Sequence, residues 1–230
     1  MRQASLRPRL AMTAGLVPHG TVVADIGTDH ARLPIYLVRE GVSPRAVASD
    51  IREGPLQNAA KAIERAGLGD RIELRRSDGF SRFAPSDAGC WVLAGMGGTL
   101  IARLLEQAPW LCEAGTTLVL QPMRHAWEAR AWLMRHGFSI QTEVACYDAG
   151  RPYHAILAVF HSEFGIRNSE LSYIYTGELP RRGHPAARQL LAGERALLQT
   201  RADALKQAKS GAGEELTRLR QILESWPENL

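Results

Sequence analysis

An apolar segment that holds one carboxylate and leads into a glycine turn is the first feature able to do chemistry. The segment is Val22–Ile26, which includes Asp25, and the turn is Gly27, Thr28, Asp29 and His30. Gly27 allows a sharp turn and a close approach of a ligand. The complete glycine pattern of a dinucleotide site is missing, and Asp29 would repel a pyrophosphate but attract the ammonium and sulfonium of S-adenosylmethionine. We expect Asp25, Gly27, Thr28 and Asp29 to bind this cofactor; an unliganded strand-to-helix turn is the alternative.

Carboxylates also follow the next two apolar segments. Asp50 and Ile51 come after Ala46–Ser49, roughly 20 residues beyond Gly27, where an acidic residue can accept hydrogen bonds from both ribose hydroxyls. Asp78 and Gly79 follow Ile72–Arg75, and a carboxylate there could face an adenine amino group. An aspartate is also a common helix N-cap, and any turn can contain Asp-Gly. The order along the chain favours one adenosyl ligand bound through Asp50, Ile51, Asp78 and Gly79.

The fourth segment ends in small residues directly before an expected helix. Cys90–Ala94 is followed by Gly95, Met96 and two more glycines. We expect Ala94, Gly95 and Met96 to contact the cofactor beside its methyl group, and backbone groups near Gly95 to hydrogen-bond a substrate base. The Asn/Asp-Pro-Pro-aromatic motif of amino-group methyltransferases is missing here, which points to a ring nitrogen or another acceptor. Tight packing of the helix on the sheet is the alternative explanation for these glycines.

The elements that must position these residues alternate between apolar strands and helices from Gly20 to Phe160. This alternation predicts a parallel sheet covered on both faces, with helices starting near Gly54, Thr99 and Ala126 and another before the sheet. A short loop at Asp148–Pro152 predicts that the final strand turns back antiparallel. We therefore predict an α/β protein with the Rossmann-like, mostly parallel seven-stranded sheet of class I methyltransferases. Its strands are Val22–Ile26, Ala46–Ser49, Ile72–Arg75, Cys90–Ala94, Thr117–Leu120, Ile140–Cys146 and His154–Phe160.

The C-terminal segment has a different pattern, with residues in heptad steps after His184-Pro185. These residues are Leu191, Leu198, Leu205, Ala212 and Leu219. Two glycines within Ser210–Gly213 interrupt the pattern, so we expect two antiparallel helices that form a coiled-coil hairpin. A single kinked helix is the alternative. The domain division that follows is a cofactor-binding methyltransferase domain over 1–162 and a helical coiled-coil domain over 163–230.

Composition excludes several classes of protein. The 230 residues are 45% hydrophobic and 23% charged, and no apolar run is long enough to cross a bilayer. No secretory signal is evident at the N-terminus, so we expect a cytoplasmic protein that does not bind membranes. The three cysteines are widely separated, which argues against a disulfide framework or a metal site. The net charge of +4 weakly favours a polyanionic partner. We expect a monomer.

Taken together, three of these motifs resemble a known family. They are Asp25–His30 with Leu33-Pro34, Ala94–Ile101, and Leu120-Gln121-Pro122. The sequence over about residues 6 to 165 resembles the bacterial tRNA (adenine-22-N1)-methyltransferases, the TrmK family. The resemblance implies methyl transfer from S-adenosylmethionine to N1 of an adenine in the D-arm region of tRNA. It also implies that a C-terminal coiled-coil domain helps to hold the RNA.

Four residues are candidates for the methyl-transfer step. Adenine N1 is uncharged near neutral pH, so its attack needs positioning more than deprotonation, and it produces a cationic base. Asp29 could stabilise that charge, His30 or the carbonyls near Gly95 could orient the exocyclic amine, and Tyr153 could stack on the base. His30 could equally be a hydrogen-bonding residue at a helix start, and Tyr153 a core tyrosine. Arg124, His125, Trp127 and Arg130 form a basic and aromatic group that suits RNA, although solvated helix arginines explain it equally well.

Two other functions remain possible from the sequence. One is a class I methyltransferase that acts on a small molecule or a protein; salt-sensitive tRNA binding would argue against it. The other is a non-catalytic RNA-binding protein that keeps the fold and uses its helical tail. Detectable methyl transfer to RNA would exclude that possibility.

Overall fold

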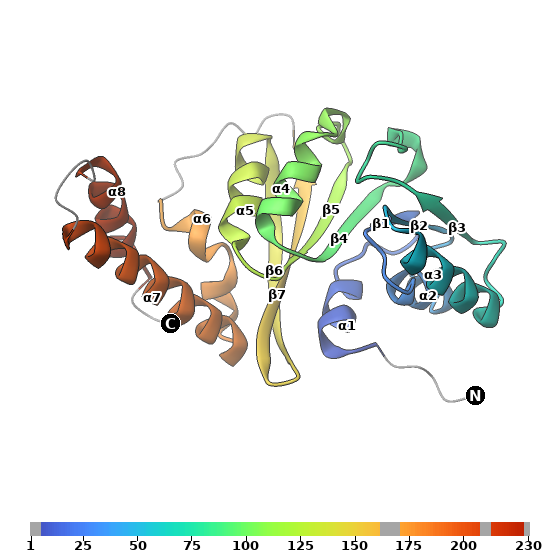
Figure 1. The fold of residues 1–230 in the computed structure, drawn as a ribbon, viewed down its shortest axis with the longest axis horizontal. Helices are drawn as coiled ribbons and strands as arrows, with labels where there is room; N and C mark the ends of the chain where they lie inside the picture. The colour runs from blue at the N-terminus through green and yellow to red at the C-terminus, as the bar shows by residue number, and fades with distance from the viewer. Residues whose placement is uncertain (1–5, 162–170, 208–212, 228–230) are drawn as a thin grey trace.

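The computed structural model describes residues 6–161, 171–207 and 213–227, and it contains one seven-stranded sheet flanked by helices (Figure 1). The strands are β1 Val23–Ile26, β2 Ala46–Asp50, β3 Ile72–Arg76, β4 Cys90–Met96, β5 Thr117–Pro122, β6 Phe138–Asp148 and β7 Arg151–Phe160. The α-helices are α1 Pro8–Ala14, α2 Arg32–Arg39, α3 Glu53–Ala66, α4 Gly98–Glu106, α5 Ala126–Arg135, α6 Tyr173–Thr176, α7 Pro185–Gln207 and α8 Gly213–Glu224. Short 3-10 helices lie at Pro85–Asp87, Pro109–Leu111 and Leu179–Arg182.

The strand order is β3-β2-β1-β4-β5-β7-β6, and β1 to β5 run parallel. The strand β7 is antiparallel to both β5 and β6, which confirms the reversed final strand and the class I methyltransferase fold. The expected hairpin loop shortens to Ala149-Gly150, because β6 extends to Asp148 and β7 begins at Arg151. Both loop residues have positive φ angles, as a tight two-residue turn requires.

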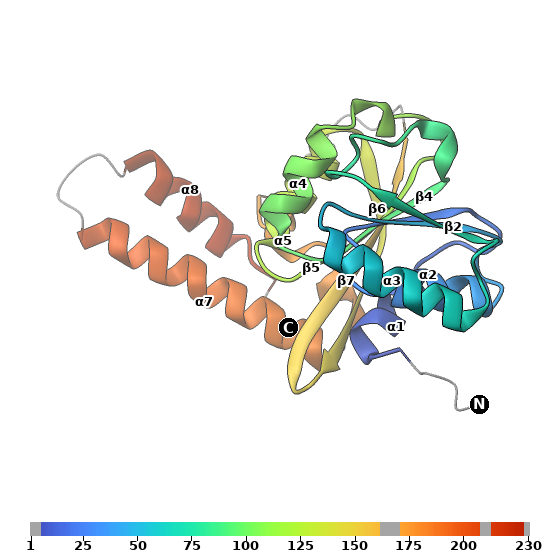
Figure 2. The same cartoon turned by 45° about the vertical axis from the view of Figure 1, so that its right-hand side comes forward.

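Apolar side chains pack on both faces of the sheet. One face packs against α4 and α5, around the fully buried Trp91 and Trp132. The other face packs against α1, α2 and α3, around residues such as Val92 and Leu37. Because successive side chains of a strand point to opposite faces, a strand that is covered on both faces is buried along its whole length, as β1, β2 and β5 are. Figure 2 shows the helices on the two sides of the sheet.

The C-terminal segment forms two separate helices, α7 and α8, which lie side by side and project away from the sheet (Figure 2). Their shared apolar seam includes the buried residues Leu191, Leu198, Leu219, Ile222 and Trp226. The expectation of two antiparallel helices is confirmed for the described residues, and the single kinked helix is wrong. The expected turn at 210–212, with the heptad residue Ala212, lies outside the described residues.

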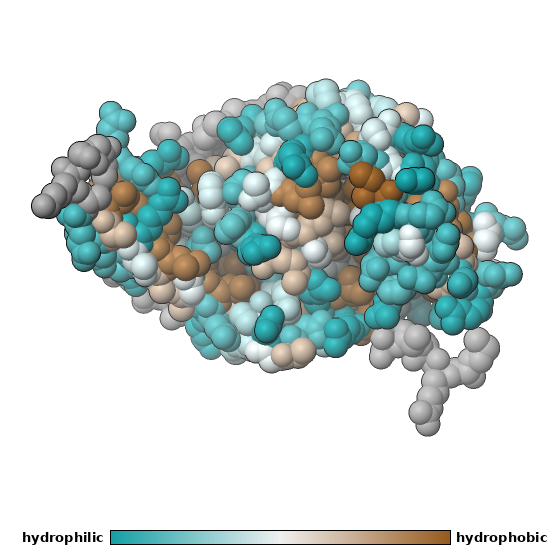
Figure 3. Space-filling model, viewed as in Figure 1, coloured by the Kyte–Doolittle hydropathy of each residue, from teal (hydrophilic) through white to brown (hydrophobic). Residues whose placement is uncertain are grey.

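The helices and the surface of the described residues can be compared with what a bilayer requires. Within the described ranges, no helix has both the length and the apolar content that a transmembrane span requires. Hydrophilic residues dominate the face of the molecule over α3 (Figure 3).

The three cysteines are free, as expected, with Cys90 buried and its thiol pKa raised to about 12 by burial.

Candidate cofactor and methyl-transfer site

The carboxyl ends of β1, β2, β3 and β4 form one continuous rim of the sheet. In the register, Ile26 pairs with Ser49 and with Leu93, and Asp50 pairs with Arg76. The sequence motifs predict ligand contacts at four residues, which therefore lie on this rim in the expected order: Gly27, Asp50, Asp78 and Gly95. Ligands in open α/β sheets bind outside the carboxyl ends of the strands, at the point where the chain reverses its winding direction. Here that reversal falls between β1 and β4, so the rim is the candidate ligand site.

The turn after β1 differs from the expected direct entry into a helix. The helix α2 begins only at Arg32, and the N–H groups of Gly27 and Thr28 both donate to the Ser49 carbonyl, at 2.8 Å and 2.7 Å. These two N–H groups are therefore not available to a ligand, because they join β1 to β2 at the rim. Gly27 has a φ of +82°, a conformation that favours glycine. Ala31 just before α2 is also left-handed, with a φ of +50°, a strained value of the kind found at ligand sites.

Asp25 and Asp50 place two buried carboxylates at the centre of the rim. Asp25 is 7% exposed and Asp50 is 6% exposed. Burial raises the pKa of Asp25 to about 6, a hydrogen bond with Thr28 opposes the shift, and the negative charge of Asp50 adds to it. Asp50 is not the N-cap of α3; its Oδ1 accepts a hydrogen bond from the Arg52 N–H at 2.8 Å. Two adjoining buried carboxylates would be stabilised by a ligand that carries a cation and hydroxyl donors.

The remaining rim residues after β2 and β3 differ in exposure. Ile51, beside Asp50, is 52% exposed and offers an apolar surface next to the acidic centre. The side chain of Asp78 is also exposed, whereas Gly79 is buried, and a β-carbon on Gly79 would lie 2.6 Å from a methyl group of Leu104. Gly79 therefore packs directly against α4. Its conformation supports the rim, and Asp78 is the more accessible of the two to a ligand.

At the end of β4, Gly95 forms a bulge against β5. Ala94 pairs with Gln121 and Met96 pairs with Pro122, so Gly95 is the unpaired residue, with a φ of +78°. Its N–H donates to Oε1 of the fully buried Gln121 at 3.1 Å. The Gly95 N–H is therefore engaged by Gln121, which leaves backbone carbonyls as the groups near Gly95 that could bind a substrate base. Gly95 itself is exposed at the rim.

Met96 lies over the glycine turn. Its Cε occupies the position that a β-carbon on Gly27 would take. Met96 thus lies directly against the backbone of Gly27. Because a methionine side chain has three rotatable bonds, it can move aside at low cost. A ligand that binds against Gly27 requires that movement.

The candidate residues for the transfer step lie on different sides of the rim. Asp29 is 73% exposed at its side chain and lies 3.3 Å from Nε2 of His30, so these two residues pair with each other. Tyr153 at the start of β7 lies on the other side, and its ring faces the guanidinium of Arg9 at 5.4 Å. The described part of the chain provides no hydrogen-bond partner for the Tyr153 hydroxyl. Tyr153 is half-buried, so it is not a core tyrosine with a paired hydroxyl.

Arg9 on α1 was not expected from the sequence at this place. Its Nη1 donates to Gln121 Oε1 at 3.2 Å and approaches Met123 Sδ at 2.8 Å. The same nitrogen lies 3.5 Å from where a β-carbon on Gly95 would be. The sequence offered no local signal for this contact, because 112 positions separate Arg9 from Gln121.

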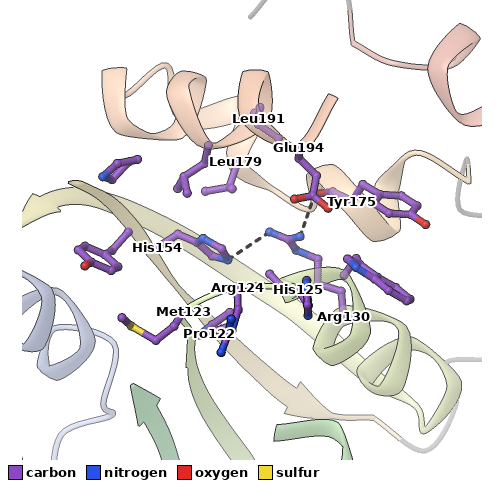
Figure 4. A pocket seen from close by; sticks show the side chains of 15 residues that line it. Pro122, Met123, Arg124, His125, Arg130, His154, Tyr175, Leu179, Leu191 and Glu194 are labelled. Carbon is purple, nitrogen blue, oxygen red and sulfur yellow. Dashed lines mark hydrogen bonds between the residues drawn. The ribbon is translucent and has the colours of Figure 1, made fainter. Parts of the chain in front are cut away.

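The basic and aromatic group after β5 divides into two parts. Arg130 is 1% exposed and forms a buried ion pair with Glu143, at 2.8 Å between Nε and Oε1, so it cannot contact RNA. Trp127 stacks on Tyr175 of α6, with ring centroids 5.7 Å apart. Arg124 and His125 remain exposed. Figure 4 shows the pocket that these residues line, between the β5–α5 loop, β7, α6 and α7; none of the four rim residues lines it.

The acidic residues of the rim do not form a metal site. Across residues 6–161, 171–207 and 213–227, no group of three or more histidine, cysteine, aspartate or glutamate side chains could hold a metal ion. The rim combines buried carboxylates, an exposed apolar residue and a glycine bulge along one edge.

Known proteins resemble this chain in sequence and in fold. A family model described as a methyltransferase domain matches residues 6–156. The tRNA (adenine(22)-N(1))-methyltransferase of Bacillus subtilis is 36% identical over 158 residues, which are 69% of this chain and 66% of that protein. The crystal structure of the Bacillus subtilis tRNA methyltransferase TrmK superposes with a TM-score of 0.85 at 30% identity, over 96% of this chain and 97% of that chain.

A second solved structure carries the cofactor. A Streptococcus pneumoniae protein in complex with S-adenosyl-L-methionine has a TM-score of 0.78 at 30% identity, over 95% of this chain and 100% of that chain. The sequence and structural matches together cover the sheet, the rim and the C-terminal helices. The chain belongs to the TrmK family of tRNA (adenine-22-N1)-methyltransferases.

Proposed function

We propose that this protein transfers a methyl group from S-adenosylmethionine to N1 of adenine 22 in tRNA. The observation that carries the proposal is the rim itself, where two buried carboxylates and a glycine bulge adjoin in the order that an adenosyl ligand needs. Membership of the TrmK family supports the choice of tRNA and of the ring nitrogen. The absence of an Asn/Asp-Pro-Pro-aromatic motif after β4 also favours a ring nitrogen over an exocyclic amine.

The residues of the rim fit the parts of the cofactor. Asp25 and the turn at 27–29 suit the methionine part, because an ionised carboxylate attracts its ammonium. Asp50 suits the ribose: Arg52 donates to its Oδ1, and no described residue donates to its Oδ2, which is left to accept from a hydroxyl. Ile51 and Asp78 suit the two sides of the adenine. When bound, the cofactor supplies an electrophilic methyl group on a sulfonium.

The protein's own part in the reaction is positioning and electrostatics. Adenine N1 attacks the methyl group with its own lone pair, in line with the bond from the methyl carbon to sulfur. No side chain therefore has to remove a proton. The exposed end of β4 at Gly95 presents backbone carbonyls to the exocyclic amine of the base. Asp29 places a negative charge near the base as it becomes cationic, and Tyr153 offers a stacking surface. His30 orients the Asp29 carboxylate through their contact at 3.3 Å.

The decisive test is methyl transfer itself. Incubation with labelled S-adenosylmethionine and unmodified tRNA should place the label in 1-methyladenosine at position 22, as detected by nucleoside analysis of tRNA fragments. A tRNA with guanine at that position serves as the matched control and should remain unlabelled. Label in a protein or a small molecule, with none in tRNA, would favour another class I methyltransferase. Binding of tRNA without any transfer would favour the non-catalytic alternative.

Cofactor affinity should depend on pH through Asp25. Its folded-state pKa of about 6 lies above the ordinary 3.8, so the free protein holds the proton below about pH 6. The cationic cofactor prefers the ionised carboxylate, so affinity should be constant above that value and should fall up to about tenfold per pH unit below it. Calorimetric titrations with S-adenosylmethionine across this range would measure the effect. Asp25→Asn should bind more weakly and show no break; an unchanged break in that variant would exclude Asp25.

The raised pKa of Asp25 also makes the free energy of unfolding depend on pH, but in the opposite direction to cofactor affinity. A carboxyl group whose pKa is raised by folding stabilises the fold when protonated, so this contribution is lost as the pH rises from about 3.8 to about 6. A bound cation offsets the loss, because it favours the ionised form. Asp25 thus stabilises the free protein less than an uncharged residue could, which is consistent with a role in binding.

We also infer a division of labour along the chain. Residues 1–162 form the methyltransferase domain, and residues 163–230 form a helical domain that helps to hold the tRNA. The separate apolar seam between α7 and α8 supports this division. Because that seam is buried within one chain, the helices need no second copy, and we propose that the enzyme acts as a monomer. We propose the cytoplasm as its location, where its tRNA substrate would be found.

A further inference from the structure

Arg9 carries a positive charge for which the described residues provide no counter-ion. It contacts an amide oxygen at Gln121, a thioether at Met123 and the ring of Tyr153. No carboxylate among the described residues lies within ion-pair distance of it, although ten other ion pairs are present in those residues. The guanidinium is therefore held in place by neutral groups.

Several hydrogen-bond donors of Arg9 remain available. A guanidinium has five N–H groups, and both polar contacts of Arg9 use the single nitrogen Nη1. Its Nη2 and Nε groups find no partner within the described ranges. A planar fork with free donors and an uncompensated charge is the group that best binds a carboxylate or a phosphate in a bidentate manner.

The location of Arg9 connects it to the reaction. Its Nη1 lies beside Gly95, and through Gln121 it shares an acceptor with the Gly95 N–H. Methyl transfer moves a positive charge from the cofactor sulfur to the base. An uncompensated guanidinium at this place would oppose that movement, whereas a guanidinium neutralised by an anion would not.

We propose that Arg9 binds an anionic group of one of the two substrates at the mouth of the methyl-transfer site. The group is either a backbone phosphate of the RNA or the carboxylate of the cofactor's methionine part. This proposal rests on the proposed function. It makes Arg9 a substrate-binding residue that α1 delivers to the rim, since α1 packs against β5, β6 and β7 next to Gly95.

The test compares Arg9→Gln, Arg9→Lys and a control, Arg45→Gln. Arg45 is exposed and directly precedes β2, so it lies at the amino ends of the strands, whereas the rim lies at their carboxyl ends. For each variant, the KM for tRNA would be measured over a range of salt concentrations. Calorimetry would give the Kd of S-adenosylhomocysteine and of 5′-methylthioadenosine, which lacks the amino-acid part. Glutamine keeps an N–H donor for Gln121, and equal unfolding midpoints would confirm that the variants fold.

Two results would support the proposal and identify the anion. A phosphate partner predicts that Arg9→Gln raises the KM for tRNA about tenfold and lowers the slope of log KM against log salt by about one unit. A carboxylate partner predicts about tenfold weaker binding of S-adenosylhomocysteine with unchanged binding of 5′-methylthioadenosine. In either case Arg9→Lys keeps the positive charge and should retain most of the wild-type affinity. Arg45→Gln should behave as the wild type.

Other results would overturn it. If Arg9→Gln lowers kcat with no change in KM, salt slope or ligand affinity, then Arg9 only supports Gln121 and Gly95. Behaviour identical to Arg45→Gln would also exclude the anion site. The ligand titrations need no turnover, so a wild type that binds these ligands but methylates no tRNA would contradict the proposed function and leave the carboxylate result for Arg9 standing; the Kd for tRNA at each salt concentration would then replace KM in the test for a phosphate partner.

Discussion

Replacement of Glu143 by glutamine is expected to lower the free energy of unfolding by about 3–5 kcal/mol, a large part of the total for a domain of this size. Glu143 is fully buried and accepts from Nε and Nη2 of Arg130, at 2.8 Å and 2.9 Å. The neutral variant leaves the Arg130 guanidinium buried without the carboxylate that pairs with it. Burial and the charge of Arg130 already lower the pKa of His154 well below its usual range, so His154 is neutral and adds no second positive charge beside Arg130.

The matched control is Glu73→Gln. Glu73 pairs with Arg75 at 2.7 Å on β3, but its side chain is 47% exposed, so the loss should be below about 1 kcal/mol. Chemical denaturation of both variants would measure the difference. Equal free energies of unfolding for the two variants would contradict the assignment of Glu143 to a buried ion pair.

The buried pair also explains how the helical tail is joined to the sheet. Nη1 of Arg130 donates to the carbonyls of Ile174 and Tyr175, at 3.4 Å and 2.9 Å, and both of these residues belong to α6. Arg130 thus links α5, β6 and α6 through one side chain. An enzyme that holds RNA with its tail and methylates it at the rim would need this fixed junction, because the two surfaces must act on one substrate molecule.

The sheet could be predicted from the sequence because its signals are local. Four of the strands from β1 to β5 are short, mainly apolar segments, β3 alternates apolar and charged residues, and the alternation of strands with helices leaves few possible topologies. The rim followed from the same reasoning, since parallel strands place their carboxyl ends at one edge. The separation of α7 from α8 was predictable from the break in the heptad pattern.

The contacts that refine the site could not be predicted in this way. Arg9 reaches Gln121 over 112 positions, and Arg130 reaches Tyr175 over 45, so no periodic pattern connects them. Arg130 looked like a surface residue because arginines on amphipathic helices usually are. The left-handed backbone at Ala31 and His125 also escaped prediction, because neither residue is a glycine, the residue that usually marks a positive φ in a sequence.

The second large effect is expected at Gly98, the first residue of α4. A β-carbon on Gly98 would overlap the backbone of His125, with its carbonyl carbon only 2.7 Å away. The two loops are also joined by backbone hydrogen bonds, from Gly98 N–H to Arg124 O at 2.8 Å and from Met123 N–H to Met96 O at 2.7 Å. Neither backbone can yield separately, so Gly98→Ala must push the β4–α4 and β5–α5 loops apart.

That displacement moves the bulge at Gly95 relative to Gln121, where the base is expected to bind. A misplacement of about 1 Å can cost about 100-fold in rate, so kcat/KM for tRNA should fall by about this factor, with a stability loss of about 1–3 kcal/mol. Gly97→Ala is the matched control, because its β-carbon would lie 3.9 Å from Arg124 Cγ and its φ is −71°. It should retain activity within about threefold. Equal activities of the two alanine variants would show that the clamp between these loops does not position the site.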